Sequence, residues 1–162
     1  MNKIILIMVF HIPFLSSGQK TIDDLLNLYN VRSVPYITVQ ELKMNFNNYT
    51  ILDTRRKEEY EVSHIPGAIW AGENPDKKQL NILIQDNSKP IVVYCSIGVR
   101  SEKYGEKLLA WGYPNVSNLY GSIFFWKDAG YPVIDKNGRE TDKVHVFKKV
   151  WGKYLSTGQK VY

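Results

Sequence analysis

The sequence has one residue whose position would let it act as a nucleophile. Cys95 is the only cysteine among 162 residues, and it directly follows the apolar run 91–94, which predicts a short buried strand. The next segment, 102–111, is rich in helix formers with apolar residues at helical spacing, and Gly112 marks its end. The loop between the two elements runs from Cys95 to Arg100.

This loop is suited to holding a thiolate. A cysteine placed between the carboxyl end of a strand and the amino end of a helix faces unpaired backbone N–H groups and the positive end of the helix dipole. Both stabilise a thiolate, and Arg100 adds a charge that cannot be lost. The sequence therefore predicts an anion-binding loop around a nucleophile. The alternative is that Cys95 is a small buried apolar residue, as free cysteines often are.

Strands and helices alternate along the rest of the chain, which predicts an α/β domain with a mostly parallel sheet. We expect helices over 22–29, 38–46, 58–61, 77–84, 102–111 and 121–130, and strands over 34–37, 49–53, 91–94 and 116–119, with a turn at 64–67 that leads into a further strand. Asp53 and Arg55 follow the strand 49–53, at the sheet edge where open α/β sheets place their sites. An ion pair that fixes a loop is the role we expect for them.

The composition limits the classes of function. Hydrophobic residues make up 44% and charged residues 23% of the chain, as in soluble globular domains, and the length suits one domain with a proper core. A net charge of +5 from 21 basic and 16 acidic residues does not specify nucleic-acid binding. It favours small anionic substrates, with an ordinary solvated basic surface as the alternative.

No metal or cofactor site is predicted. His11, His64, His145 and Cys95 lack the spacing that zinc ligands require, and no stretch resembles a glycine-rich nucleotide-binding loop.

The first residues predict a secretory signal. Lys3 precedes an apolar run that continues to Leu15, and small residues at 16–18 suit cleavage by a signal peptidase. We expect cleavage after Gly18, export to a periplasmic or extracellular compartment, and no stable membrane insertion of the mature chain. An uncleaved membrane anchor is the alternative. In an oxidising compartment a lone thiol such as that of Cys95 is exposed to oxidation, so we expect it to be used or well buried.

The remaining chain divides into a domain over 19–135, which includes an N-terminal helical extension, and a basic tail over 136–162. The tail predicts an amphipathic helix, with apolar residues on one face at Val144, Phe147, Val150, Trp151 and Tyr154. Such a helix can lie on a membrane or recruit a protein partner. Docking on the chain's own domain is the arrangement we favour.

Seven stretches, in a fixed order, carry a resemblance to a known family: 53–55, 58–60, 64–68, 94–101, 112–116, 119–121 and 126–133. Over roughly residues 34–135 the chain resembles the rhodanese-like domain. The resemblance implies an α/β fold in which helices flank a mostly parallel central sheet on both faces. It also implies a thiosulfate- or persulfide-type sulfurtransferase.

In such an enzyme Cys95 would take a sulfane sulfur from a donor, hold it as a persulfide, and pass it to cyanide or a thiol. The anion-binding loop would consist of Ser96, Ile97, Gly98, Val99, Arg100 and Ser101, with Asp53 and Arg55 in support. Backbone N–H groups of that loop would stabilise the thiolate and the persulfide. Arg100 would hold the donor's anionic end or brace the loop rim. We expect His64 to be a turn histidine and Glu59 a solvated helix residue.

Two other functions are weighed against transfer. Phosphatases of this fold carry five residues between the cysteine and the arginine, whereas this chain carries four, which argues against phosphate. A non-catalytic sulfur carrier, sensor or binding module is the main alternative. The chain also departs from the family: many members have glycine where Ser63 and Ser122 stand, and Ile97 and Val99 make the loop more apolar. The apolar loop weakens the expectation that thiosulfate is the preferred donor.

Overall fold

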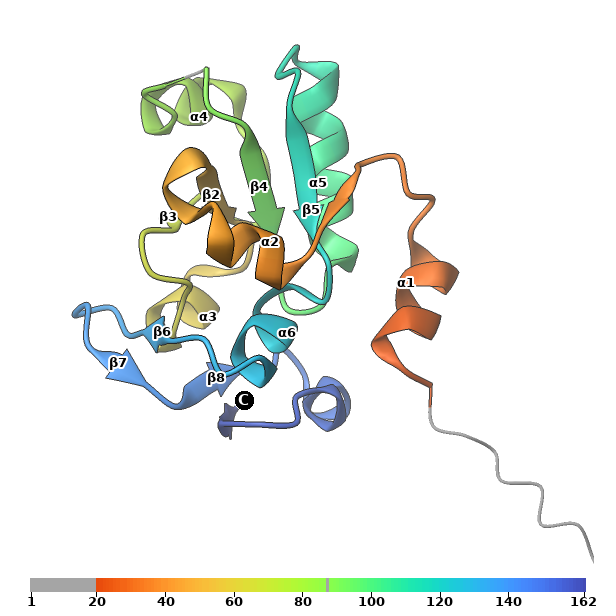
Figure 1. Cartoon of the computed structure of the whole chain (residues 1–162), viewed down its shortest axis with the longest axis vertical. Helices are drawn as coiled ribbons and strands as arrows, with labels where there is room; N and C mark the ends of the chain where they lie inside the picture. The colour runs from red at the N-terminus through yellow and green to blue at the C-terminus, as the bar shows by residue number, and fades with distance from the viewer. Residues whose placement is uncertain (1–19, 87) are drawn as a thin grey trace, which may run out of the picture.

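The computed structural model describes residues 20–86 and 88–162. A five-stranded sheet in the order β1-β5-β4-β2-β3 forms its centre (Figure 1). All of its neighbouring strands pair in parallel, so the predicted α/β domain with a mostly parallel sheet is confirmed. The strands are β1 (Tyr36–Ile37), β2 (Thr50–Asp53), β3 (Ile69–Trp70), β4 (Ile91–Tyr94) and β5 (Val116–Leu119).

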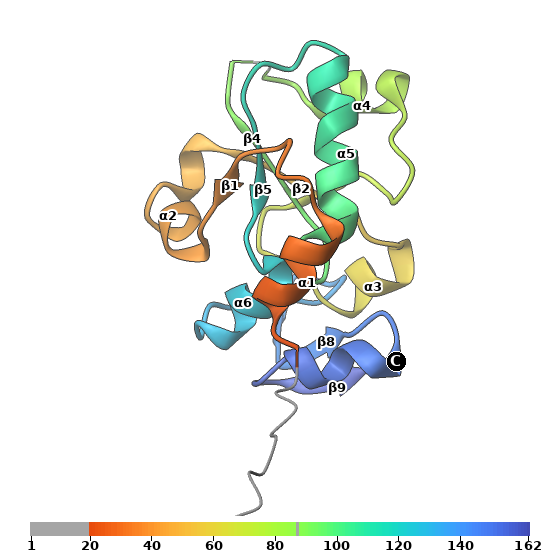
Figure 2. The ribbon, with the colours of Figure 1, turned by 90° about the vertical axis from the view of Figure 1, so that its right-hand side faces the viewer.

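Helices cover both faces of this sheet. The helices are α1 (Ile22–Tyr29), α2 (Val39–Met44), α3 (Lys57–Val62), α4 (Lys77–Leu83), α5 (Val99–Ala110) and α6 (Ser122–Asp128). Because side chains alternate along a strand, Val92 and Tyr94 of β4 pack with α2 and α6, while Ile91 and Val93 pack with α4 and α5. Figure 2 shows α2 on one side of the sheet and α4 and α5 on the other.

The predicted elements are present with shifted bounds. The strand predicted over 34–37 pairs only over Tyr36–Ile37, and the helix predicted over 38–46 ends at Met44, before a short 3-10 turn, η1 (Phe46–Asn48). The shifted bound that matters most for function is the first residue of α5. This helix begins at Val99, so Arg100 lies in its first turn, next to the cysteine loop.

The predicted tail helix is wrong. The tail instead forms β7 (Glu140–Thr141), which pairs with β6 (Val133–Ile134), and β8 (Lys143–His145), which pairs in parallel with β9 (Gln159–Val161). A 3-10 helix, η2 (Lys149–Tyr154), lies between β8 and β9. Val144 and Val146 are both buried at a spacing of two, the period of extended chain, and pairing with β9 holds this segment as a strand. Phe147 then has a φ of 64°, which no continuous α-helix contains.

The tail packs on the domain at the carboxyl ends of the strands (Figures 1 and 2). Val144, Val146 and Leu155 are buried in the same core as α6, and Trp151 and Tyr154 pack against that core. The apolar residues of the tail therefore cover the domain on the side where the cysteine loop lies.

The predicted signal segment, 1–18, lies outside the described residues. In the part of the chain that the structure describes, no helix has the length and apolar character needed to span a bilayer.

Candidate active site

Cys95 lies at the carboxyl end of β4, immediately before the loop that leads into α5. Its side chain is buried, with only 1% of the residue exposed. Two donors reach its sulfur: the Gly98 backbone N–H at 3.2 Å and the Ser101 hydroxyl at 3.5 Å. The thiol is therefore enclosed, and its sulfur also accepts hydrogen bonds, one of them from the backbone of the loop that follows Cys95.

The electrostatics of this position favour the thiolate. Burial raises the pKa of the Cys95 thiol. The charge of Arg100 and the hydrogen bonds from Ser101 and Gly98 together lower it by more than burial raises it, so the net shift is downward. A lowered pKa increases the thiolate fraction near neutral pH, and the thiolate is the nucleophilic form.

The turn that brings the Gly98 N–H to the sulfur needs glycine. Gly98 has a φ of 110°, and an added Cβ would lie 3.2 Å from Leu26 Cδ2 and 3.5 Å from the Leu119 carbonyl oxygen. Its own carbonyl accepts hydrogen bonds from the side-chain amides of Asn30, at 2.9 Å, and Asn118, at 2.8 Å. The N-terminal extension, through Asn30, therefore helps to fix the loop.

Ser122 is a site residue that sequence reasoning missed. Its hydroxyl accepts a hydrogen bond from the Cys95 N–H and donates one to the Leu119 carbonyl, each at 3.1 Å. It has a φ of 51°, in the left-handed region where glycine is favoured. The position therefore has the backbone that a glycine would adopt, and the serine hydroxyl adds a hydrogen bond to the Cys95 backbone. Ser63, in contrast, has extended backbone with a φ of −168°.

Arg100 is held by an ion pair on the neighbouring helix α3. Its guanidinium donates to both carboxylate oxygens of Glu59, each at 2.8 Å, and to the Ser96 hydroxyl at 3.0 Å. The face of the Phe147 ring lies 4.2 Å from the guanidinium carbon. With these partners in place, Arg100 braces the loop rim, and these bonds use three of its five N–H groups.

The expectation that Glu59 is solvated is wrong. Its side chain is fully buried; besides Arg100, it accepts hydrogen bonds from the Ser96 hydroxyl at 3.3 Å and from the Arg56 N–H at 3.1 Å. Burial raises the pKa of the Glu59 carboxyl, but the hydrogen bonds and charge of Arg100 outweigh it and hold the pKa below its ordinary value. The available signal was the position of Glu59, third in its helix, where an acid can bond back to the chain.

Asp53 and Arg55 form a fully buried ion pair beneath the loop, with 2.6 Å between Arg55 Nη2 and Asp53 Oδ2. Arg55 Nη2 also donates to the Ser63 carbonyl at 2.7 Å, and the Tyr94 hydroxyl donates to Asp53 at 2.6 Å. This network ties the strand that ends at Tyr94 to the turn after α3. It positions the residue before Cys95 and does not touch the sulfur.

His64 lies in that turn. Its Nδ1 is 3.0 Å from the Tyr60 carbonyl, and its ring stacks on Tyr60 with 3.8 Å between centroids. Burial lowers the pKa of His64. These contacts give it a structural role in the turn, as expected.

The sequence profile of a family described as the rhodanese-like domain matches residues 38–129. The chain belongs to the rhodanese-like family. The match covers more than half of the chain and includes the whole segment from Cys95 to Ser101.

Similar proteins include sulfurtransferases. The adenylyltransferase and sulfurtransferase UBA4 of Candida albicans is 28% identical over 117 residues, which are 68% of this chain and 26% of that protein. A tRNA uridine(34) hydroxylase of Streptococcus suis is 35% identical over 98 residues, 54% of this chain and 29% of that protein. The chain therefore spans less than a third of the curated relatives it matches.

Two solved structures have the same fold. The thiosulfate sulfurtransferase of Pseudomonas aeruginosa superimposes with a TM-score of 0.59 at 28% identity, over 67% of this chain and 21% of that one. A rhodanese-like domain protein of Staphylococcus aureus gives a TM-score of 0.53 at 29% identity, over 64% of this chain and 99% of that one. The predicted family and fold are thereby confirmed.

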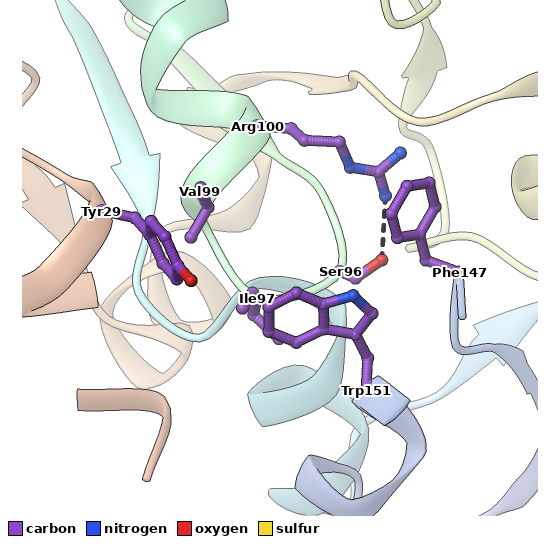
Figure 3. A pocket seen from close by; sticks show the side chains of 7 residues that line it. All are labelled: Tyr29, Ser96, Ile97, Val99, Arg100, Phe147 and Trp151. Atoms are coloured by element: carbon purple, nitrogen blue, oxygen red, sulfur yellow. Dashed lines mark hydrogen bonds between the residues drawn. The ribbon is translucent and has the colours of Figure 1, made fainter. Parts of the chain in front are cut away.

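Segments outside the matched rhodanese-like domain close over its cysteine loop. A pocket of about 170 Å³ lies on the outer side of this loop (Figure 3). Its floor consists of loop and α5 residues, and its walls are Tyr29 from α1 and Phe147 and Trp151 from the tail. Sequence reasoning placed none of these three aromatic residues at the site. Within residues 20–86 and 88–162, no group of three potential metal ligands is found.

Proposed function

We propose that this rhodanese-like protein is a sulfurtransferase that carries a sulfane sulfur on Cys95. The observation that supports the proposal is the hydrogen bonding of the Cys95 sulfur by the Gly98 N–H and the Ser101 hydroxyl beside the charge of Arg100. This environment lowers the pKa of the thiol. Sulfur transfer requires a thiolate, and the chain is related to sulfurtransferases, so the lowered pKa supports this activity.

The reaction runs in two displacements. The Cys95 thiolate attacks the outer sulfur of a donor, an S–S bond forms, and the bond between the donor's two sulfurs breaks, its electron pair leaving with the rest of the donor. A thiol or cyanide then attacks the outer sulfur of the persulfide and releases the Cys95 thiolate. The Gly98 and Ser101 donors offset the negative charge at both stages, because they are already oriented toward the sulfur.

Intact-mass spectrometry tests the proposal. After incubation with a sulfane-sulfur donor, the protein should gain the mass of one sulfur atom, and the gain should disappear on addition of cyanide. Because Cys95 is the only cysteine in the sequence, the site of the gain needs no further mapping, and Cys95→Ser is the control. No gain from thiosulfate, an organic thiosulfonate or an organic persulfide would overturn the proposal.

A non-catalytic sulfur carrier or binding module is the second candidate. The observation that favours it is the low exposure of Cys95, of which only 1% is accessible to solvent. A carrier would gain the sulfur and hold it, whereas an enzyme would release it to cyanide repeatedly. Turnover with cyanide present in excess over protein separates the two.

We also propose that the protein is exported, on the basis of the apolar run and small residues in positions 4–18. The same mass measurement, made on protein expressed with its N-terminus intact, should show a mature chain that begins at Gln19. A full-length mass in the membrane fraction would instead indicate an uncleaved anchor.

A further inference from the structure

The outer side of the cysteine loop has an apolar pocket of defined size, built partly by residues outside the matched rhodanese-like domain. Its lining residues are Tyr29, Ser96, Ile97, Val99, Arg100, Phe147 and Trp151, and Figure 3 shows them gathered around one opening. Four of them belong to the segment that follows Cys95 in the chain, so a molecule in the pocket lies against the loop that surrounds the sulfur.

The volume of the pocket sets the size of its occupant. At about 170 Å³, it is comparable to the engineered apolar cavity of roughly 150 Å³ that binds benzene. Three aromatic rings, from Tyr29, Phe147 and Trp151, contribute to its wall, and aromatic walls favour a ring or a short alkyl group of that size. Inorganic thiosulfate has no carbon group and would leave these surfaces uncovered.

The charged residues that line the pocket determine which charge on a ligand is favoured there. Among the described residues that line it, Arg100 alone carries a charge. Its guanidinium is paired with the carboxylate of Glu59 and covered on one face by Phe147. The wall is therefore close to neutral, and a small dianion such as thiosulfate gains little there. An apolar body that carries one negative charge at its sulfur end fits better.

We infer that this pocket is a specificity subsite for the carbon group of an organic sulfane-sulfur donor, with Phe147 and Trp151 as its specificity-determining residues. The inference rests on the proposed sulfur transfer and names its donor class: a compound R–SO2–S⁻ or R–S–S⁻ in which R is apolar and about the size of benzene. With an aryl thiosulfonate, Cys95 takes the outer sulfur and the aryl sulfinate leaves with the electron pair of the broken S–S bond.

The probe is benzenethiosulfonate, compared with thiosulfate in the same assay. Both donors give thiocyanate when cyanide is the acceptor, so the ratio of their kcat/KM values reports donor choice alone. Removing one aromatic wall should lower this ratio at least about tenfold, the low end of what a hydrophobic pocket discriminates per group. We therefore expect that fall in Phe147→Ala and in Trp151→Ala.

Val150→Ala is the matched control. Val150 lies in the same 3-10 helix as Trp151, is 61% exposed, and does not line the pocket. Its ratio should equal that of the wild type. A ratio that is also unchanged in Phe147→Ala and Trp151→Ala overturns the inference. Equal changes in both kcat/KM values overturn it as well, because that pattern indicates a cover over the site without selection of the carbon group.

A binding measurement separates failure of the subsite from failure of the proposed function. Benzenesulfinate, the leaving group, should bind to the Cys95→Ser protein in calorimetry and bind at least about tenfold more weakly after Phe147→Ala is added. If benzenesulfinate binds but no donor transfers sulfur, the subsite stands and the transferase proposal fails. If sulfur is transferred but benzenesulfinate does not bind, the subsite inference fails alone.

Discussion

Replacing Glu59 by glutamine tests the electrostatic account of the site through two measurements. The free energy of unfolding should fall, and the Cys95 thiol should become more acidic. Glu59 is fully buried and accepts two hydrogen bonds from Arg100, whose side chain is 24% exposed. Removing one partner of a buried ion pair costs about 3–5 kcal/mol. Water that reaches Arg100 reduces this cost, so we expect Glu59→Gln to lose about 3 kcal/mol of unfolding free energy.

Urea unfolding measures that loss. For a slope of about 2 kcal/mol per molar urea, typical of a domain of this size, the midpoint should fall by about 1.5 M. Glu58→Gln is the matched control, since Glu58 is the adjacent residue of the same helix and is exposed; its midpoint should stay within about 0.3 M of the wild type. Equal midpoints for Glu59→Gln and Glu58→Gln would refute the role of the pair.

The thiol should become more acidic in the same variant. Glu59 neutralises part of the Arg100 charge that lowers the pKa of Cys95. Without the carboxylate, the Arg100 charge acts on the sulfur unopposed, and the pKa should fall below the wild-type value. Titration of thiolate absorbance in the ultraviolet, with Cys95→Ser as the blank, measures the pKa of Cys95 directly. A rise in the thiol pKa would refute the electrostatic reasoning even if stability fell as expected.

The difference in unfolding free energy between the wild type and Glu59→Gln should also depend on pH. The pKa of Glu59 is held below its ordinary value in the folded protein, so in the wild type the unfolded chain takes up the proton first as the solution is acidified. The stabilisation from Glu59 is therefore complete above about pH 4.3, the unfolded pKa, and is lost as pH falls through the folded pKa. The wild-type and Glu59→Gln midpoints should converge below that pH.

Three further variants test separate parts of the site. Gly98→Ala should lose about 1–3 kcal/mol of unfolding free energy, and more than Gly112→Ala. Both glycines have positive φ, but of the two only Gly98 has neighbours within 4 Å of an added Cβ. Urea midpoints of the two variants give the comparison. Ser122→Ala should lose about 1–2 kcal/mol with the bond to the Cys95 N–H, again by urea unfolding. Burial lowers the pKa of His145, so wild-type stability should fall as pH drops below about 6.5, and His145→Asn should show a smaller fall between pH 7.5 and 5.5.

The sequence alone predicted the sheet and the position of Cys95 directly after its central strand. The reason is that β4 is a continuous apolar run with a helix-forming segment after it, and both signals are local. The bounds of α5 were less accurate. The helix starts at Val99, directly after Gly98, which has a φ of 110° and leaves no free space for a Cβ because Leu26 and Leu119, both distant in the sequence, lie close by.

Glu59 shows why burial of a charge is hard to predict. In the sequence it stands in a strongly charged helix, where solvent exposure is the ordinary expectation. Its partner Arg100 lies 41 positions further along the chain, and no periodicity in either segment indicates that they meet. The same limit applies to Ser122, whose hydroxyl reaches the Cys95 N–H across 27 positions.

The tail prediction failed because helical spacing and strand spacing coincided. Val144, Phe147, Val150 and Trp151 fit a helical face, while Val144 and Val146 fit an extended segment equally well. Pairing between β8 and β9, which no local pattern specifies, decides between the two. The bend at Phe147, where the His145 ring accepts the Phe147 N–H at 3.0 Å, then completes the departure from a helix.

The position of that bend links the tail to the electrostatics of Cys95. The His145 bond holds the Phe147 backbone, the Phe147 ring lies on Arg100, and Arg100 sets part of the Cys95 pKa. A ring on one face of the guanidinium excludes water there, and a charge with less water around it acts more strongly on its neighbours. We therefore expect the tail to stabilise the Cys95 thiolate through Arg100. If the proposed subsite is correct, the acidity of Cys95 and the choice of donor depend on the same aromatic residue.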